Sequence, residues 1–417
     1  MKNRILLCTS ISVLLLSSCL VGCGGNTSSS SEEIISSSEE IPSSITLESF
    51  NEPLDIHTDI QNTFLSISDP ALQDKSIDGK SELSRPKGVT LSWEDSIECS
   101  SYSVMISENE DMSNSKRYFT SDKEIELYNL KIATTYYWKV IQSVKDGQVS
   151  KVGSFETIGE GPRNLYVDGV TNFRDMGGWM TSSGTRMNQG ILYRGARLNN
   201  SYSTGFDKDS KIRDEYCVVE PEITEDGEKV FTDDLKIKTE IDLRDTNGNG
   251  YPGGGIPGSV DQAPTIGSVV DGVTYIAIPM DNSATIEDNK EEIKEFFEVL
   301  ANKDNYPIYY HCNIGTNRTG MVSYLIGALC GMSQHDLELD YMFSNLGTIA
   351  LPTPLSSNRK RTELIELTGE YEKNTYGASY VVNSFEGNNL IEKAENCLKD
   401  CGVSQETIDA VRKIMMD

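Results

Sequence analysis

The chain has little positive charge. Its 417 residues include 37 lysines and arginines against 64 aspartates and glutamates, a formal net charge of −27 at pH 7, and no basic run. This charge repels nucleic acids and anionic lipids at long range, so we expect no nucleic-acid partner. With three histidines and no His/Cys pair at zinc-site spacing, the sequence predicts neither a metal site nor another cofactor.

The nine cysteines show no disulfide framework. Cys397 and Cys401 would lie one helical turn apart, which is a poor geometry for a bridge. We therefore expect the cysteines after residue 23 to be buried structural thiols. Cys312 is the exception, because of the residues around it.

The N-terminus has the features of a targeting segment. Lys2 and Arg4 precede a mostly apolar stretch at 5–20, which is short for a membrane span. Leu20-Val21-Gly22-Cys23 follows and resembles a bacterial lipobox. The resemblance implies cleavage before Cys23 and a diacylglycerol on its sulfur.

We thus predict a signal peptide at 1–22 and a protein exported and lipid-anchored to the outer face of a bacterial cell membrane. Multiple acyl chains hold a protein on a membrane durably. A plain secretory signal, a helical anchor, and a second lipobox ending at Cys19 remain alternatives. The Ser/Glu-rich residues that follow predict a flexible tether at 23–53.

Short stretches of alternating apolar and polar residues occupy 86–157, with polar turns between them. This pattern predicts an antiparallel β-sandwich. The stretch resembles a fibronectin type III domain: Trp93 matches its core tryptophan, and Leu130 with Thr134 and Tyr136 matches the approach to its tyrosine corner. The usual proline and glycine of that turn are replaced by Ile132 and Ala133.

We assign this domain to 54–158, although the sequence leaves its start open between Leu54 and Pro86. Its aromatic residues are expected in the core. A surface ligand such as a carbohydrate is the alternative role for them.

A different pattern begins near Gly161. Apolar strands are predicted at 236–243, 274–278 and 307–310, and they alternate with amphipathic or apolar helices at 286–301 and 319–329. Strands alternating with helices predict an α/β domain at 160–417, with a central sheet flanked by helices.

His311-Cys312-Asn313-Ile314-Gly315-Thr316-Asn317-Arg318-Thr319-Gly320 lies between the last predicted strand and its helix. Backbone N–H groups in a tight loop before a helix bind phosphate oxygens. Arg318 adds a permanently charged fork, and the same field favours a thiolate at Cys312. The motif predicts phosphate monoester hydrolysis through a cysteinyl-phosphate.

Each residue of the motif has an expected role. Cys312 is the nucleophile, and Thr319 donates a hydrogen bond to its sulfur when it leaves. His311 orients the loop rather than acting as a base or metal ligand. Phosphate is expected to contact Asn313, Ile314, Gly315, Thr316, Asn317 and Arg318.

The leaving oxygen needs a proton donor. Asp281 is our first candidate because it follows a predicted strand, and the carboxyl ends of parallel strands share one edge of a sheet. Asp245, after another strand, is the rival.

Several further motifs resemble those of the bacterial atypical tyrosine and dual-specificity phosphatases, a branch shared with phosphoinositide-active members. These motifs stand at 171–178, 192–198, 241–244 and 340–345, and the resemblance spans about 163–417. It implies Cys312 as nucleophile and Arg318 as phosphate ligand. Within the first of these motifs, at 171–178, Arg174 and Asp175 are expected to be structural.

Thr316 and Asn317 depart from the Lys-Asp of many relatives. Thr316 cannot supply a cation for further phosphates, and Asn317 cannot donate an acidic proton, which moves the acid role to Asp281. We therefore expect a phosphotyrosine-type protein or a small phosphomonoester as substrate. Inositol phosphates or phosphoinositides, and a non-catalytic adhesion or phosphate-binding module, are the alternatives.

Overall fold

The computed structural model describes residues 43–77, 81–159, 161–203, 218–244, 267–281, 283–347, 364–368 and 377–417. The predicted signal peptide, Cys23, Cys217 and Asp245 lie outside this part of the chain. Residues 43–417 belong to one compact unit. Among the described residues, no helix has the length and apolar character needed to span a membrane.

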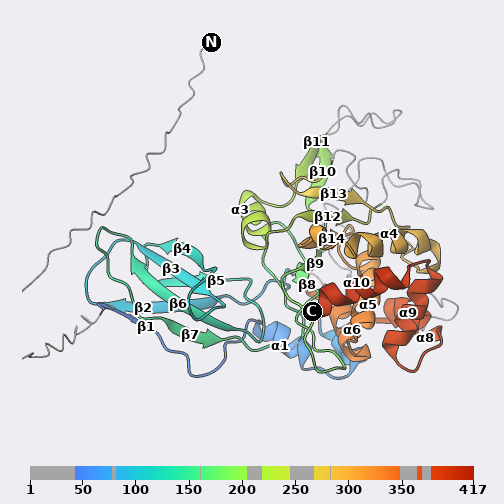
Figure 1. Cartoon of the computed structure of the whole chain (residues 1–417), viewed down its shortest axis with the longest axis horizontal. Coiled ribbons are helices and arrows are strands. Elements are labelled where there is room, and N and C mark those ends of the chain that lie inside the picture. The colour runs from blue at the N-terminus through green and yellow to red at the C-terminus, as the bar shows by residue number, and fades with distance from the viewer. Residues whose placement is uncertain are drawn as a thin grey trace, which may run out of the picture. The chain divides into compact units, whose positions relative to one another are not determined.

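Two antiparallel sheets form the first part of the described chain (Figure 1). The first has the order β1-β2-β5, with β1 at Ile45–Leu47, β2 at Val89–Asp95 and β5 at Glu124–Leu127. The second has the order β4-β3-β6-β7, with β4 at Lys116–Thr120, β3 at Tyr102–Ser107, β6 at Thr135–Gln142 and β7 at Gly153–Glu156.

The two sheets share one hydrophobic cluster. Alternate residues of β2 and β6 point inward, so Trp93 and Trp138 are buried together with Tyr102 and Phe155. This alternation is what the sequence predicted for 86–157. The edges of the region differ from the prediction, because β1 lies within the predicted tether and pairs with β2.

Two short helices occupy the start of the predicted sandwich. The first, α1 at Asp59–Leu65, begins with a capping box in which Thr58 and Gln61 exchange hydrogen bonds. The second, α2 at Pro70–Ser76, begins with a proline, which suits a first helical turn. Phe64 and Ile77 join the hydrophobic core of the following α/β part, so these residues do not belong to a sandwich as predicted for 54–158.

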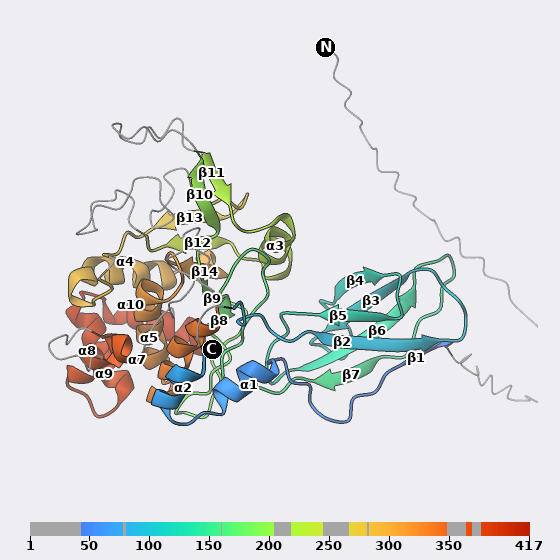
Figure 2. The same ribbon diagram turned by 180° about the vertical axis from the view of Figure 1, so that it is seen from behind.

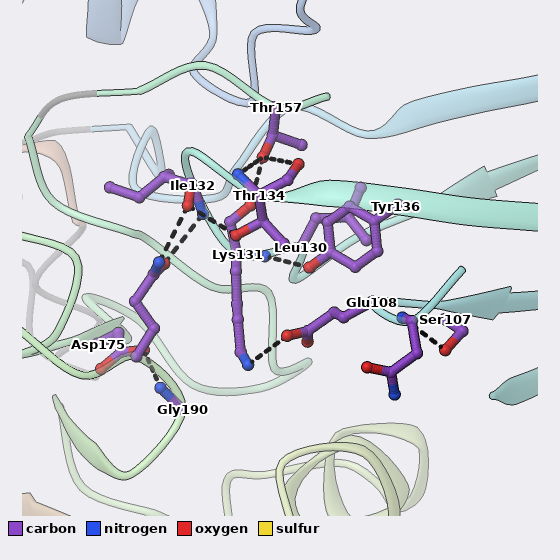
Figure 3. Close-up of polar contacts among 12 residues, drawn as sticks. Ser107, Glu108, Leu130, Lys131, Ile132, Thr134, Tyr136, Thr157, Asp175 and Gly190 are labelled. Carbon is purple, nitrogen blue, oxygen red and sulfur yellow. Dashed lines mark hydrogen bonds and ion pairs between the residues drawn. The ribbon is translucent and has the colours of Figure 1, made fainter. Parts of the chain in front are cut away.

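The loop 129–134 connects the two parts through backbone groups. Arg163 donates to the carbonyls of Asn129 and Leu130, at 2.6 and 3.0 Å, and Ile132 exchanges two hydrogen bonds with the Gln189 amide. Figure 3 shows this loop's own contacts, in which the Lys131 N–H donates to the Tyr136 hydroxyl at 2.8 Å.

A five-stranded sheet organises the remainder of the chain, with the order β13-β12-β14-β9-β8. Its strands are β8 (Arg174–Asp175), β9 (Leu192–Gly195), β12 (Thr239–Asp242), β13 (Thr274–Ala277) and β14 (Ile308–His311). All neighbouring strands are parallel except β8 and β9. A separate hairpin pairs β10 (Asn199–Ser203) with β11 (Val218–Pro221).

Successive residues of the central strand face opposite sides of the sheet. Ile308 and Tyr310 join the larger core with the helices, whereas Tyr309 packs with Phe173 and Phe231 on the other side. Figures 1 and 2 show helices α4, α5, α9 and α10 gathered beside the strands, and α3 on the opposite side. The predicted α/β arrangement, with a central sheet flanked by helices, is therefore confirmed.

The helices of this part have the following bounds: α3 at Glu225–Lys229 (continued by a π-helical turn at Val230–Asp234), α4 at Lys290–Leu300, α5 at Asn317–Cys330, α6 at Gln334–Phe343, α7 at Leu364–Thr368, α8 at Ala378–Ser384, α9 at Leu390–Asp400 and α10 at Gln405–Met416. Helix α5 is buried on nearly every side and ends at Gly331, which is left-handed. A helix buried all round is held rigidly, so its N-terminus is fixed relative to the sheet.

Candidate active site

The loop between β14 and α5 lies at the carboxyl edge of the sheet. Strand β14 ends at His311 and α5 begins at Asn317, as the sequence predicted within two residues. Gly315 is left-handed in this loop, with φ +71°, and a Cβ there would collide with the backbone of Gly195. Only glycine therefore permits the loop to curl this tightly against the neighbouring strand.

Cys312 lies at the base of the loop and is only 2% exposed. Burial raises the pKa of its thiol, but the Arg318 charge, the Thr319 hydroxyl and the N–H groups of Thr316 and Thr319 outweigh burial and lower it to about 7. A considerable fraction of Cys312 is thus a thiolate near neutral pH.

Arg318 stands in the first turn of α5 and is 4% exposed. One terminal nitrogen donates to the Leu243 carbonyl at 3.4 Å, and its Nε has no hydrogen-bond partner among the described residues. The buried Thr316 hydroxyl likewise lacks a partner there. Buried polar groups are seldom left unsatisfied, so these atoms are suited to an anion held by the loop.

Asn172 and Arg194 hold the loop between β14 and α5 in place through hydrogen bonds. The Asn172 amide donates to the carbonyls of Ile314 and Gly315, at 3.2 and 3.1 Å, and Arg194 donates to the Gly315 carbonyl at 2.9 Å. The acceptors of these hydrogen bonds are thus carbonyl oxygens of the loop. Both residues lie within the motifs at 171–178 and 192–198, and their role depends on contacts between residues more than 100 positions apart in the chain.

Arg174 and Asp175 also contact protein groups. Asp340 bridges Arg174 and Arg194, at 2.7 and 2.6 Å, and all three side chains are buried. Burial raises the pKa of Asp340, but the two guanidinium groups hold it below the usual carboxyl value. Asp175 pairs with Arg163 at 2.6 Å. These contacts agree with the structural role that we expected for Arg174 and Asp175.

Arg197, two residues after the end of β9, binds Asn313. The Arg197 side chain donates to the Asn313 amide oxygen at 2.9 Å, and the Arg197 N–H donates to the Asn313 carbonyl at 3.0 Å. These two hydrogen bonds fix the position of Asn313 at the start of the loop.

Glu240, Asp242 and His311 are the one group of potential metal-ligating side chains that converges in the described part of the chain. Most of their polar atoms are engaged with protein partners, whereas the Oε2 of Glu240 has no hydrogen-bond partner among the described residues. Asp242 binds Arg244 at 2.6 Å and accepts from Tyr275 at 2.9 Å, and His311 contacts Glu240. The cluster is thus assembled as a hydrogen-bond network.

Asp281 follows β13 on the same edge of the sheet. In register, Ala277 at the end of β13 and His311 at the end of β14 both pair with Asp242 of β12. The Asp281 carboxylate accepts from the Ser283 N–H at 2.7 Å. The Asp281 N–H donates to the Asn289 side chain before α4 at 2.6 Å. The acid role of Asp281 stays a prediction, and its rival Asp245 lies outside the described residues.

A model of the tyrosine phosphatase family matches residues 165–212 and 220–417, more than half of the chain. The chain belongs to the tyrosine phosphatase family. It is accordingly a phosphoric monoester hydrolase of the tyrosine-phosphatase type.

Among solved structures, the chain is similar to the core catalytic domain of the PP-IP phosphatase SIW14 from S. cerevisiae, determined in complex with citrate. The two are 15% identical with a TM-score of 0.23, and the match covers 41% of this chain and 80% of that chain. None of the curated proteins compared matches this chain.

Proposed function

We propose that this phosphatase hydrolyses phosphate monoesters through a cysteinyl-phosphate, and that it acts as a protein-tyrosine or dual-specificity phosphatase. The observation that carries the proposal is the buried Cys312 thiol, with a pKa of about 7, next to a buried Arg318 whose Nε has no partner among the described residues. A lowered thiol pKa beside an anion-binding group is what a thiolate nucleophile needs.

The reaction has two displacement steps. In the first, the Cys312 sulfur forms a bond to phosphorus while the bond from phosphorus to the ester oxygen breaks, and Asp281 supplies the proton that the leaving oxygen takes up. In the second, water attacks phosphorus and gives a proton back to the Asp281 carboxylate, while the bond from sulfur to phosphorus breaks and the sulfur leaves as a thiolate, to which Thr319 donates. The net products are an alcohol or phenol and inorganic phosphate.

Arg318 and the loop N–H groups act in both steps. They bind the phosphoryl oxygens, on which negative charge is held as the transition state forms. The fixed N-terminus of α5 adds the positive end of its helix dipole.

Substrate class is inferred from the loop composition. Thr316 offers a hydroxyl where many relatives carry a lysine, so the loop supplies one guanidinium rather than two cations. The net charge of −27 further opposes highly anionic substrates. Inositol phosphates and phosphoinositides are therefore the second candidates.

A substrate panel tests this proposal. The chain from residue 24 is suitable because residues 43–417 form one compact unit. We expect phosphotyrosine peptides to be hydrolysed with higher kcat/KM than inositol phosphates. Cys312→Ser should abolish turnover of every substrate, whereas Cys99→Ser, in the first part of the chain, should leave it unchanged. Equal rates for Cys312→Ser and the parent would exclude the thiolate mechanism.

We also propose that the first two sheets form a fibronectin type III-like module. The buried Trp93 supports this assignment. So does the Tyr136 hydroxyl, which accepts from the Lys131 backbone in the manner of a tyrosine corner. A module of this kind would present a surface ligand to the phosphatase. An experimental structure with a different strand connectivity would contradict the assignment.

Export and lipid anchoring through Cys23 complete the proposal. The apolar stretch and lipobox-like residues 20–23 motivate it. Metabolic labelling with a fatty acid should mark the full chain in a bacterial host and should fail for Cys23→Ala. Persistent labelling of Cys23→Ala, but not of Cys19→Ala, would move the anchor to the alternative position.

A further inference from the structure

A side chain of the first two sheets holds the backbone of the catalytic part. Asn129 lies in the loop 129–134 between β5 and β6, and its amide pairs with Tyr166 in both directions. Its Nδ2 donates to the Tyr166 carbonyl at 2.9 Å, and its Oδ1 accepts from the Tyr166 N–H at 2.6 Å. One amide thus satisfies both backbone polar groups of one residue, as a neighbouring strand would.

Tyr166 belongs to a hairpin at 164–174. The Leu165 N–H of its first arm donates to the Phe173 carbonyl of its second arm at 2.9 Å. Asn172, next to Phe173, donates to two carbonyl oxygens of the loop between β14 and α5. The hairpin therefore joins the backbone that is held by the first two sheets to the side chain that holds the phosphate-binding loop.

Arg163 makes a second connection just before the hairpin. It is buried, donates to the Asn129 and Leu130 carbonyls, and pairs with Asp175 at 2.6 Å. Asp175 also accepts from the Gly190 N–H (Figure 3). Removing Arg163 would leave a buried carboxylate without its cation, which costs stability as well as position. Asn129 carries no charge, so the loss of its side chain can be interpreted as a change of position.

The backbone at Asn129 permits a variant without added strain. Its φ is +65°, in the left-handed region that asparagine and glycine tolerate better than other residues. Asn172, at the other end of the connection, has φ +60°. Asn129→Gly and Asn172→Gly therefore each remove one amide and keep the turn in which it stands.

We propose that Asn129 is a positioning residue for the phosphatase reaction, and that it acts on the phosphate-binding loop through the hairpin 164–174 and Asn172. The first two sheets are then part of the framework of the active site rather than a separable attachment. The kinetic test rests on the proposed function, in which Cys312 is the nucleophile.

The effect is expected in catalysis more than in substrate binding. Without the Asn129 amide the hairpin is held less firmly, and the N–H groups of the phosphate-binding loop converge less well on the phosphoryl group. Small displacements of such groups weaken transition-state stabilisation. We expect kcat/KM to fall about fivefold in Asn129→Gly, with most of the loss in kcat.

A double-mutant cycle tests whether Asn129 acts through Asn172. Asn129→Gly should lower kcat/KM about fivefold in the parent but less than about 1.5-fold in Asn172→Gly, because the other end of the connection is already missing there. A merely structural role would not depend on Asn172. Equal losses in the two backgrounds would therefore overturn the proposal.

Asn114→Gly is the matched control. Asn114 stands between β3 and β4 with φ +54°, is exposed, and its side chain has no hydrogen-bond partner in the described part of the chain. This variant should keep the kcat/KM of the parent. If urea unfolding shows that Asn129→Gly is not folded, Asn129→Asp replaces it in the cycle, because it keeps the shape and the left-handed turn but cannot donate to Tyr166.

Alkylation of Cys312 by iodoacetamide provides a measurement without turnover. The N–H groups of Thr316 and Thr319 help to lower the pKa of Cys312, so a loosened loop should raise the pH midpoint of alkylation. We expect a rise of about half a pH unit in Asn129→Gly and no further rise when this change is added to Asn172→Gly.

An unshifted alkylation midpoint or an unchanged kcat/KM in a folded Asn129→Gly protein would overturn the proposal. If Cys312→Ser retained activity, the proposed function would fail, while the alkylation cycle would still decide whether Asn129 acts on the loop through Asn172.

Discussion

At the scale of single residues, the charge of Arg318 and its fork geometry make separable contributions. Burial raises the pKa of Cys312, and the Arg318 charge is the largest of the influences that lower it to about 7. The fork binds two phosphoryl oxygens together. We therefore expect Arg318→Lys to keep a low alkylation midpoint for Cys312 while losing about a hundredfold in kcat/KM.

Arg318→Ala should lose the activity and also raise the alkylation midpoint towards that of an ordinary buried thiol. Alkylation rates against pH, measured beside steady-state kinetics, separate the two effects. If Arg318→Lys raised the midpoint as far as Arg318→Ala, the charge of Arg318 would not be what stabilises the thiolate.

The pH profile of the parent follows from the same residues. The pKa of Cys312 lies below its usual value, so the thiolate, and with it kcat/KM, should rise as pH increases through about 7.

If Asp281 is the acid, Asp281→Asn should lower kcat because the leaving oxygen loses its proton donor, while Asp304→Asn, an exposed control, should match the parent. A phosphoester with a very acidic leaving group should be affected least, because it needs no proton donor. An unchanged kcat for Asp281→Asn would favour the rival candidate, Asp245.

At the scale of elements, the turn before β8 holds the loop after β14. Asn172 adopts a left-handed backbone with φ +60°, which asparagine tolerates and alanine does not. Its amide binds two loop carbonyls. Asn172→Gly keeps the turn and removes the amide, so we expect kcat/KM to fall about tenfold with a loss of about 1–3 kcal/mol in unfolding free energy.

Asn172→Ala should lose further stability at similar kcat/KM, because only strain is added. Urea unfolding and kinetics on both variants test this order. Full activity in Asn172→Gly would show that the loop holds its shape without the turn.

The elements that could be predicted from sequence are those with a local signal. The apolar strand before Cys312, the helix after Arg318 and the alternation in β2 and β6 depend on neighbouring residues, and the structure has them close to the predicted positions. Asn172 under the loop and Glu240 beside His311 depend on contacts between distant segments. Hydrophobic periodicity does not encode such contacts. The sequence therefore identified the nucleophile Cys312 but not the residues that hold its loop in place.

Helices α1 and α2 illustrate the same limit at a domain boundary. The sequence leaves the start of the sandwich open between Leu54 and Pro86, so it does not decide to which part these helices belong. The capping box at Thr58 and Gln61 is a local signal from which the start of a helix can be predicted. That Phe64 packs in the core of the α/β part can be known only from the fold.

At the scale of the whole molecule, the catalytic part extends beyond the region that matches the family. Phe64 is 1% exposed and packs edge-to-face on Phe343, at 6.0 Å between ring centroids. The Ser84 hydroxyl accepts the backbone N–H of Asn172 at 3.1 Å, and the Leu83 N–H donates to the Leu346 carbonyl at 2.6 Å. Residues 59–77 and 81–85 thus complete both the core and the turn that supports the phosphate loop.

Phe64→Ala should therefore destabilise the phosphatase by about 3–5 kcal/mol, the cost of emptying a buried phenylalanine site. Phe119→Ala, on β4 and 69% exposed, is the matched control and should change stability by less than about 0.5 kcal/mol. A fragment beginning at residue 160 should unfold at lower urea than one beginning at residue 43, and its kcat/KM should fall because Asn172 loses Ser84. If the shorter fragment matched the longer one in both measurements, residues 59–77 and 81–85 would be a passive cover and the family-matched region would be sufficient for catalysis.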